Sequence, residues 1–274
     1  QFFAGPFDDV APGEDTFTPV QRQSRYCAPC HFGVFWDTVV YNSFGEWLDS
    51  PYSNPVTGKT CQDCHMPAGL ADRFARPDAG GLIRDPQTIF SHRMPGAADE
   101  ELLRNAVRMD VTAGREGQQL VVMVDVTNDR TGHHVPTDSP LRHLILTVAA
   151  TDLEGHVLPQ VGGPVIPQWC GVGDPNQGCY AGLPGKAFAK VLEELWTEVS
   201  PTGAYWNPTR VLSDNRIAAL ATDTSRYVFA GPANGEALVE VTLLFRRAFI
   251  NLATQKDWPM QDIVMESKKI TVSP

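Results

Sequence analysis

Two pentapeptides of the form C-x-x-C-H constrain this chain more than any other feature. They occupy residues 27–31 (CAPCH) and 61–65 (CQDCH). In such a motif the two thiols add across the two vinyl groups of one haem, and the histidine that follows binds its iron. Two copies in one chain make coincidence untenable. The sequence therefore predicts two covalently attached c-type haems (haem C). The residues predicted to bind them are the thioether cysteines Cys27, Cys30, Cys61 and Cys64 and the proximal histidines His31 and His65.

Two other uses of paired cysteines compete with haem attachment. Two C-x-x-C pairs can form a four-cysteine zinc site. However, the gap between Cys30 and Cys61 is longer than a zinc ribbon needs, and zinc gives no reason for a histidine after both pairs. A thioredoxin-like redox pair lies in a βαβ pattern, and no such pattern surrounds either motif. Both alternatives are weaker than haem.

Each iron also needs a ligand on its far side. A second histidine there gives a closed, low-spin iron suited to electron transfer, whereas an empty position permits chemistry. The sequence has seven histidines, two of them proximal, so bis-histidine ligation of both irons is the economical hypothesis. The five remaining histidines are His92, His133, His134, His143 and His156.

Local context ranks these candidates. His92 and His133 each follow a chain reversal, so we predict them as the distal ligands. His134 and His143 are the alternatives, although His143 has the hydrophobic neighbours of a strand residue that simply packs. His156 follows a turn and is expected to be solvated. Met66 and Met94 are rival donors of lower rank.

The two ends of the chain differ in pattern. Residues 1–104 are irregular and hold four of the six cysteines. One helix is expected at 32–48, where apolar residues recur at near-helical spacing. This region has few regular apolar faces, so a pair of haems is expected to fill its core. The sequence predicts an α+β protein with a dihaem domain at 1–104 and a β domain at 105–274.

The second part has the period-two pattern of strands. Alternating apolar residues occur at 120–126, 144–148, 237–249 and 263–272, which predicts an antiparallel, immunoglobulin-like β-sandwich. Residues 187–195 fit either a helix or an edge strand. A Gly-rich loop between Cys170 and Lys186 is expected to be an excursion from the sandwich.

The net charge limits the possible partners, and the use of cysteine indicates the cellular compartment. The formal net charge of −10 disfavours nucleic acid and anionic membranes as partners. No apolar run is long enough to span a bilayer. Cys170 and Cys179 are close in a loop, and a disulfide between them fits an oxidising compartment; two free loop thiols are the alternative. Because the chain begins at Gln1 without an initiator Met, we expect a processed, secreted protein, either periplasmic or extracellular.

Several stretches resemble a family of multihaem c-type cytochromes with an N-terminal haem-binding part and a C-terminal β-sandwich. The matching stretches are residues 46–52 (EWLDSPY), 60–67 (TCQDCHMP), 91–96 (SHRMPG), 132–137 (GHHVPT), 180–186 (YAGLPGK), 214–217 (DNRI) and 245–249 (FRRAF). The resemblance implies that His92 and His133 are axial ligands. Family members commonly carry more than two haems, so this chain is haem-poor. Some similar cytochromes form extracellular filaments, in which an axial histidine can come from a neighbouring subunit.

Electron transfer is therefore the predicted function, without catalysis. His31 and His65 are 34 positions apart, which should hold the two haems close together. The protein would be either a filament subunit, associating head to tail with copies of itself, or a soluble shuttle that docks to redox partners. A haem reductase or peroxidase would need an open iron, and a pure binding module would need the region 1–104 to fold without haem.

Overall fold

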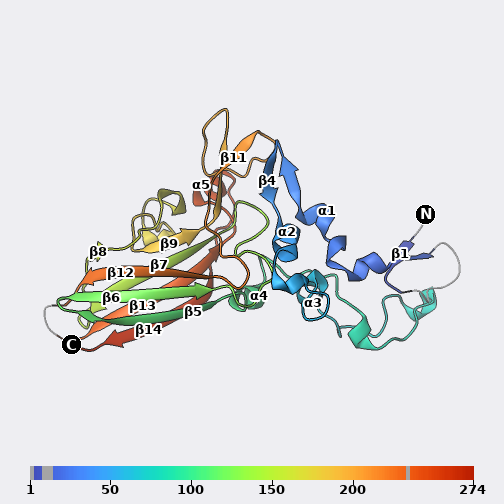
Figure 1. The fold of residues 1–274 in the computed structure, drawn as a ribbon, viewed down its shortest axis with the longest axis horizontal. Helices are drawn as coiled ribbons and strands as arrows, with labels where there is room; N and C mark the ends of the chain where they lie inside the picture. Colours follow the sequence, from blue (N-terminus) through green and yellow to red (C-terminus); the bar gives the residue numbers. More distant parts are fainter. Residues whose placement is uncertain (1–2, 8–14, 233–234) are drawn as a thin grey trace.

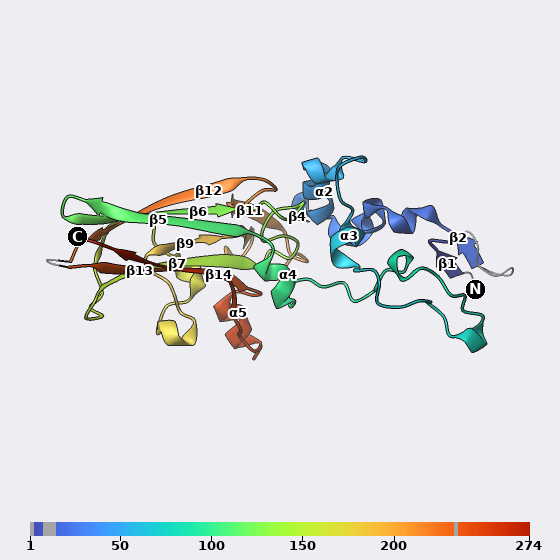
Figure 2. The same cartoon turned by 90° about the horizontal axis from the view of Figure 1, so that it is seen from below.

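The computed structural model describes residues 3–7, 15–232 and 235–274. The molecule is elongated (Figures 1 and 2). A body of long strands forms one end, and an irregular N-terminal region extends from the other. Strand β1 and the C-terminus lie at opposite ends of the long axis.

The N-terminal region is built from very short elements. Its helices are α1 (Ala28–His31), α2 (Ser43–Leu48), α3 (Cys61–His65) and α4 (Glu100–Arg104). Its strands are β1 (Phe3–Gly5), paired in parallel with β2 (Asp15–Phe17), and the antiparallel pair β3 (Gly33–Phe35) and β4 (Thr38–Tyr41). Single 3-10 turns are η1 (Pro19–Arg22), η2 (Ser24–Tyr26), η3 (Pro51–Ser53), η4 (Pro77–Ala79) and η5 (Pro86–Thr88).

The single helix expected at 32–48 is wrong. A β-hairpin occupies its first part, with Trp36 and Asp37 at positive φ in the turn, and only α2 is helical. The stretch before Asn42 is rich in aromatic and β-branched residues, which favour strands. Asn42 then caps α2, because its side chain accepts a hydrogen bond from the Gly45 amide at 3.1 Å.

Two antiparallel four-stranded sheets form the body. One sheet has the order β5-β6-β12-β8 and the other β14-β13-β7-β9. Their strands are β5 (Arg108–Glu116), β6 (Gln119–Thr127), β7 (His143–Asp152), β8 (Gln160–Gly162), β9 (Gly185–Phe188), β12 (Thr222–Ala230), β13 (Ala237–Arg246) and β14 (Ile263–Val272). The four strands expected from alternation are confirmed, although β13 ends before residue 247. The immunoglobulin-like character of the topology stays a prediction.

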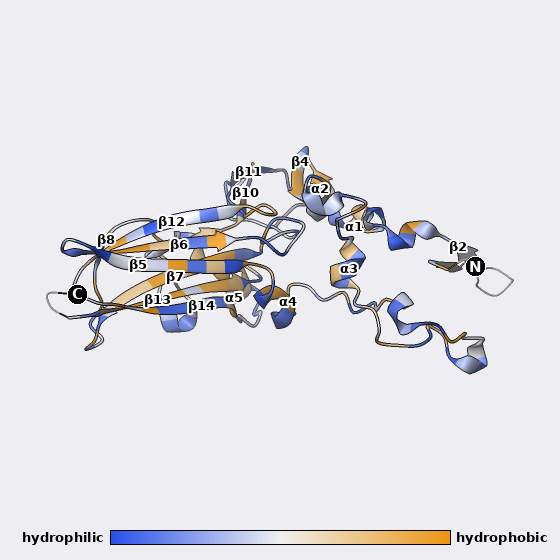
Figure 3. Ribbon diagram, turned by 60° about the horizontal axis from the view of Figure 1, so that its bottom comes forward, coloured by the Kyte–Doolittle hydropathy of each residue, from blue (hydrophilic) through white to orange (hydrophobic). Residues whose placement is uncertain are grey.

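The hydrophobic core lies between these two sheets. Fully buried side chains from both sheets form one cluster, with Leu120 of β6 and Tyr227 of β12 on one side and Leu146 of β7 and Val241 of β13 on the other. Orange, apolar segments run along these strands in Figure 3. The body therefore buries its own apolar side chains without any added group. Leu103 of α4 joins the same cluster, so the predicted domain boundary after residue 104 falls just past a helix that packs on the sandwich.

Residues 187–195 are extended, as one of the two expectations had it. They form the second half of β9 and then β10 (Lys190–Glu194), which pairs with β11 (Thr209–Asp214) as a separate hairpin. The remaining helix of the body is α5 (Ile250–Gln255). Within the described ranges, every helix is too short or too polar to cross a membrane.

The loop between β8 and β9 corrects a second expectation. It carries the turns η6 (Gln168–Cys170) and η7 (Pro175–Gln177). The predicted disulfide is not supported, because Cys170 and Cys179 are free thiols. The Cys170 thiol is buried in an apolar cluster, which raises its pKa to about 12.

Buried Arg246 holds this loop instead of a disulfide. Its guanidinium donates to the Cys170 carbonyl at 3.1 Å and to the Gly178 carbonyl at 2.8 Å. The charge is balanced by Asp262, at 2.6 Å. Charge-assisted hydrogen bonds of this kind are stronger than neutral ones, so one side chain of β13 holds the loop at two points.

Candidate haem centre

The two C-x-x-C-H motifs lie side by side, although 34 positions separate their histidines. The thiols of Cys27 and Cys61 lie close enough to perturb each other's titration, and this lowers the pKa of Cys61 to about 6 and raises that of Cys27. The Cys61 amide donates to the Ser24 hydroxyl at 3.1 Å. The buried Gln62 amide group donates to the carbonyls of Gln21 and Gln23, both at 2.9 Å. The first cysteines of the two motifs are therefore neighbours.

The second motif helix is closed by its own cap. Thr60 and Asp63 form a capping box, in which the Thr60 hydroxyl accepts from the Asp63 amide and the Asp63 carboxylate accepts from the Thr60 amide. This arrangement satisfies two amides at the start of α3. It stabilises the short helix that carries Cys64 and His65.

His65 faces His133, which comes from the loop between β6 and β7. The two imidazole rings have their centroids 6.2 Å apart and their planes within 24° of parallel. Residues 65 and 133 meet only through the fold, because nothing in the local sequence joins them. The structure thus brings one predicted proximal histidine and one predicted distal histidine together.

Hydrogen bonds fix the tautomer of both rings. His65 Nδ1 lies 2.7 Å from the Pro95 carbonyl oxygen, and His133 Nδ1 lies 2.9 Å from the His134 carbonyl oxygen. A carbonyl only accepts, so each Nδ1 carries the hydrogen and each Nε2 has a free lone pair. Metal-binding histidines have this arrangement, with the outer nitrogen held by a carbonyl or carboxylate.

The spacing of the rings suits a shared metal ion. Metal–imidazole bonds are about 2.0–2.1 Å long, as known for zinc. Two such bonds, plus the part of each ring between nitrogen and centroid, add up to roughly 6.2 Å when both Nε2 atoms point at the metal, and this matches the centroid separation. Burial also lowers the pKa of His133, which keeps its imidazole neutral and able to act as a ligand. The donor set fits a bis-histidine iron.

The loop that carries His133 is held from several sides. The Asn128 side chain donates to the His133 carbonyl at 2.8 Å, and so does the Thr131 hydroxyl at 2.9 Å. The next amide, that of His134, donates to the buried Glu46 carboxylate at 3.2 Å. Burial would raise the pKa of Glu46, but Arg216 at 2.7 Å holds it below its usual value. Sequence reasoning gave these residues no supporting role, although Glu46 and Arg216 lie in the matching stretches 46–52 and 214–217, because only the fold brings them to the His133 loop.

His31 of the first motif has a different partner. Its Nδ1 lies 3.4 Å from the Asp138 carboxylate, which raises the pKa of His31. The Ser43 hydroxyl donates to the same carboxylate at 3.4 Å. Arg142 lies 3.7 Å from its other oxygen. Asp138 was also missed from the sequence, where nothing but its place after the GHHVPT stretch could have suggested it.

The other histidine candidates lie elsewhere. His92 is exposed, and its loop meets the segment just after the second motif through the Ser91 amide, which donates to the Pro67 carbonyl at 3.0 Å. His134 is half-buried beside Glu46, with Nδ1 3.5 Å from the carboxylate. Across the part of the chain that is described, no contact joins either of them to His31.

His143 is packed inside the sandwich. It is fully buried on β7, stacks on Phe249 with centroids 4.9 Å apart, and meets the edge of Trp169. Its Nδ1 lies 3.1 Å from the Leu141 carbonyl. Burial lowers its pKa to about 4. This aromatic surrounding is that of a core residue, and no contact between described residues links His143 to either motif.

The N-terminal region leaves much apolar surface uncovered. Among its described residues, only Val40, Ile89 and Leu103 are buried hydrophobics. Exposed large hydrophobics of the same region are Phe17, Tyr26, Phe32, Val34, Trp36, Val39, Leu48, Val56, Leu70, Phe74, Leu82, Ile83, Phe90 and Met94. Most large apolar side chains of this region thus lie outside any core, which is unfavourable unless another group covers them. The residues present therefore fit large apolar groups such as two porphyrins.

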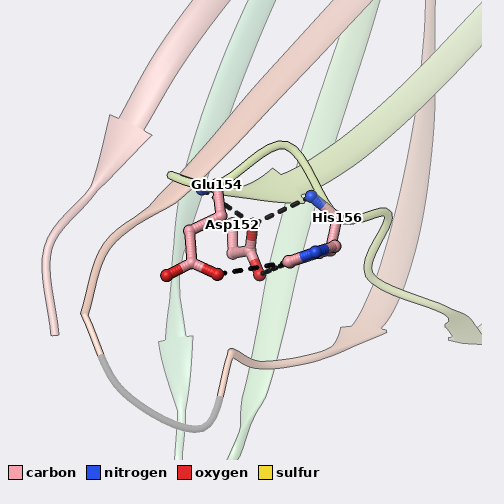
Figure 4. A group of neighbouring side chains, drawn as sticks. All are labelled: Asp152, Glu154 and His156. Carbon is pink, nitrogen blue, oxygen red and sulfur yellow. Dashed lines mark hydrogen bonds and ion pairs between the residues drawn. The ribbon is translucent and has the colours of Figure 1, made fainter.

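The geometry does not favour the zinc alternative. The described residues contain one convergent group of three or more metal-type ligands, and it is not made of cysteines. It consists of Asp152, Glu154 and His156, whose ligand atoms lie within 4.8 Å of one another in the turn after β7 (Figure 4). His156 Nδ1 lies 3.0 Å from the Asp152 carboxylate, so these side chains are already partners of one another.

Comparison with known proteins identifies a similar fold but no family. No protein-family model matches the chain, and no curated protein matches it. It is similar to the crystal structure of a penta-heme cytochrome c552 from Thermochromatium tepidum, with a TM-score of 0.67 and 19% sequence identity over 96% of this chain. The chain spans 61% of the length of that cytochrome. A PapD-like domain of human CEP192 also matches over 62% of this chain and 84% of that domain, but its 7% identity and TM-score of 0.23 carry no argument.

Proposed function

We propose that this chain is a dihaem c-type cytochrome that transfers electrons. Cys27 and Cys30 would hold one haem, with His31 on its iron, and Cys61 and Cys64 the other, with His65 and His133 on its iron. The facing pair of His65 and His133 is the single observation that carries the proposal. Similarity to the fold of a penta-heme cytochrome supports it.

The haems, when bound, supply reversible one-electron chemistry. The chain itself would orient the ligand rings through the carbonyls of Pro95 and His134. It would also keep the attachment points close together, because Cys27 and Cys61 are near enough to shift each other's pKa. Short spacing between haems is what direct electron exchange requires. The exposed apolar side chains of the N-terminal region would cover the porphyrin faces.

Absorption and electron paramagnetic resonance spectra of the purified protein test this proposal. We expect low-spin signals from the iron on His65 and His133. Carbon monoxide added to the reduced protein should leave that iron unchanged. High-spin signals from every iron would contradict the bis-histidine assignment.

A haem reductase or peroxidase is the second candidate, and one observation favours it. The described contacts place no histidine opposite His31, whose side chain is half exposed. If that iron has an open position, carbon monoxide or nitrite should bind to one haem per chain. If it is also low-spin and inert, electron transfer alone remains.

The association state belongs to the same proposal. Exposed His92 could serve the iron on His31, either from its own chain or from a neighbouring copy. A head-to-tail contact between elongated copies would build an extracellular filament, whereas a soluble periplasmic shuttle would stay single. Electron microscopy of secreted material distinguishes the two, since isolated particles alone would remove the filament. In both versions the partners are redox proteins or an external acceptor.

A further inference from the structure

The two proximal histidines have chemically different partners at Nδ1. His65 donates to the neutral carbonyl of Pro95 at 2.7 Å. His31 instead has the carboxylate of Asp138, at 3.4 Å. Each of these contacts involves the ring nitrogen that would point away from the iron. The two proposed haem sites therefore differ in the group beside the proximal histidine, which is a carbonyl at His65 and a carboxylate at His31.

Asp138 is held in place as a carboxylate acceptor. Its side chain is 22% exposed, and its backbone has φ of 69°, a conformation that a non-glycine residue seldom adopts. Ser43 of α2 donates to one oxygen at 3.4 Å, and Arg142 lies 3.7 Å from the other. Asp138 thus reaches His31 from the loop before β7, across the junction between the two regions.

The physical effect of such a partner has a definite sign. A carboxylate beside Nδ1 makes the imidazole a more basic ligand than a neutral carbonyl does, because its negative charge attracts the Nδ1 hydrogen. A more basic ligand, together with nearby negative charge, stabilises ferric iron over ferrous iron. The group that contacts the outer nitrogen of an iron-binding histidine is one of the means by which a protein sets a haem potential.

We propose that Asp138 is a positioning residue that makes the two haems unequal, giving the haem at Cys27–His31 the lower reduction potential. This inference rests on the proposed dihaem function. It goes beyond that function by assigning an order to the two sites. It also explains why a polar pair is placed at the junction between the regions.

A spectroelectrochemical titration of the holoprotein tests the assignment. Asp138→Asn should raise the lower of the two potentials, so that reduction becomes easier by roughly tenfold in equilibrium constant, or about 59 mV for one electron. The higher potential should stay in place. The electron paramagnetic resonance signal of the same haem should move, because the ligand field of His31 changes. Asp138→Glu, which keeps the carboxylate, should restore much of the original potential.

Glu240→Gln is the matched control, since it removes one negative charge from the sandwich, where Glu240 pairs with Lys269 at 3.2 Å. It should move neither potential. Equal shifts of both potentials in Asp138→Asn, or no shift of either, would overturn the inference while leaving a dihaem protein intact. Should Asp138→Asn fail to fold, Ser43→Ala provides the second variant: loss of this donor should lower the same potential slightly, and a rise or no change would count against the proposal. Absence of haem from the wild-type chain would instead defeat the proposed function.

Discussion

The sandwich and the N-terminal region solve the problem of burial in opposite ways. In the sandwich, side chains such as Leu146, Tyr227 and Val241 meet across two sheets and are fully buried. In the N-terminal region, three buried hydrophobics stand against fourteen large exposed ones among the described residues. Hydrophobic burial is the main favourable term in folding. The comparison teaches that the sandwich supplies its own core, whereas the N-terminal region needs one from outside the polypeptide.

The largest expected effect comes from removing the attachment chemistry. Replacing Cys27, Cys30, Cys61 and Cys64 together by Ala should unfold the N-terminal region, because it would lose the groups that cover its apolar side chains. Hydrogen exchange should then show lost protection over residues 17–96. Strands β6, β7 and β13 should keep theirs. Full protection in both regions would show that the N-terminal region folds without haem.

A core truncation in the sandwich should have the reverse pattern. Leu146→Ala removes a fully buried side chain, and such changes cost about 2–5 kcal/mol in the free energy of unfolding. Urea denaturation followed by tryptophan fluorescence measures it, and the haem spectrum should not change. Leu153→Ala is the control, because Leu153 is 68% exposed and should cost less than about 0.5 kcal/mol. A changed haem spectrum in Leu146→Ala would mean that the two regions are not separable.

His143 should make the sandwich sensitive to acid. Burial lowers its pKa from 6.5 to about 4. Between these two values the unfolded chain binds a proton and the folded chain does not, so stability is present above pH 6.5 and is lost as the pH falls toward 4. The loss should be about 3 kcal/mol, at 1.36 kcal/mol for each pKa unit.

Denaturation curves of wild type and His143→Gln between pH 7 and pH 4 check this expectation. The wild type should lose more stability than the variant over that range. His156→Gln, which alters a histidine with a 71% exposed side chain, should behave as wild type. Parallel curves for wild type and His143→Gln would remove His143 from the account of the sandwich.

The smallest expected effect is confined to one iron. His133→Ala should convert one haem from low-spin to high-spin, because its imidazole faces His65, while the sandwich keeps its stability. His92→Ala tests the other predicted distal ligand in the same way. His156→Ala should leave the spectra unchanged. An unaltered low-spin spectrum in both His133→Ala and His92→Ala would show that the distal assignment is wrong.

The sequence predicted local patterns well and long-range contacts poorly. Alternation located β6, β7, β13 and β14, because each strand has one face in the core. The prediction of one helix over residues 32–48 was wrong, because apolar residues of a hairpin and of the helix after it happen to recur at helical spacing. The loop at Cys170 is held by Arg246, which lies 76 positions away. The sequence near Cys170 does not predict such a long-range hydrogen bond.

The candidate site divides in the same manner. Each C-x-x-C-H motif is contiguous, so its chemistry was legible in the sequence. His133 was predicted from the GHHVPT stretch, but its opposition to His65 depends on how the sandwich loop meets α3. Asp138 and Glu46 have roles only because distant segments converge on them. Contacts of this type require the fold.

Intact mass spectrometry of the mature chain tests the central claim most directly. The account predicts a mass equal to the polypeptide plus two haems, with both haems retained after denaturation because thioether bonds hold them. Peptides from residues 27–31 and 61–65 should each carry one haem. A polypeptide without added porphyrin mass, or with haem that is released on denaturation, would contradict the account.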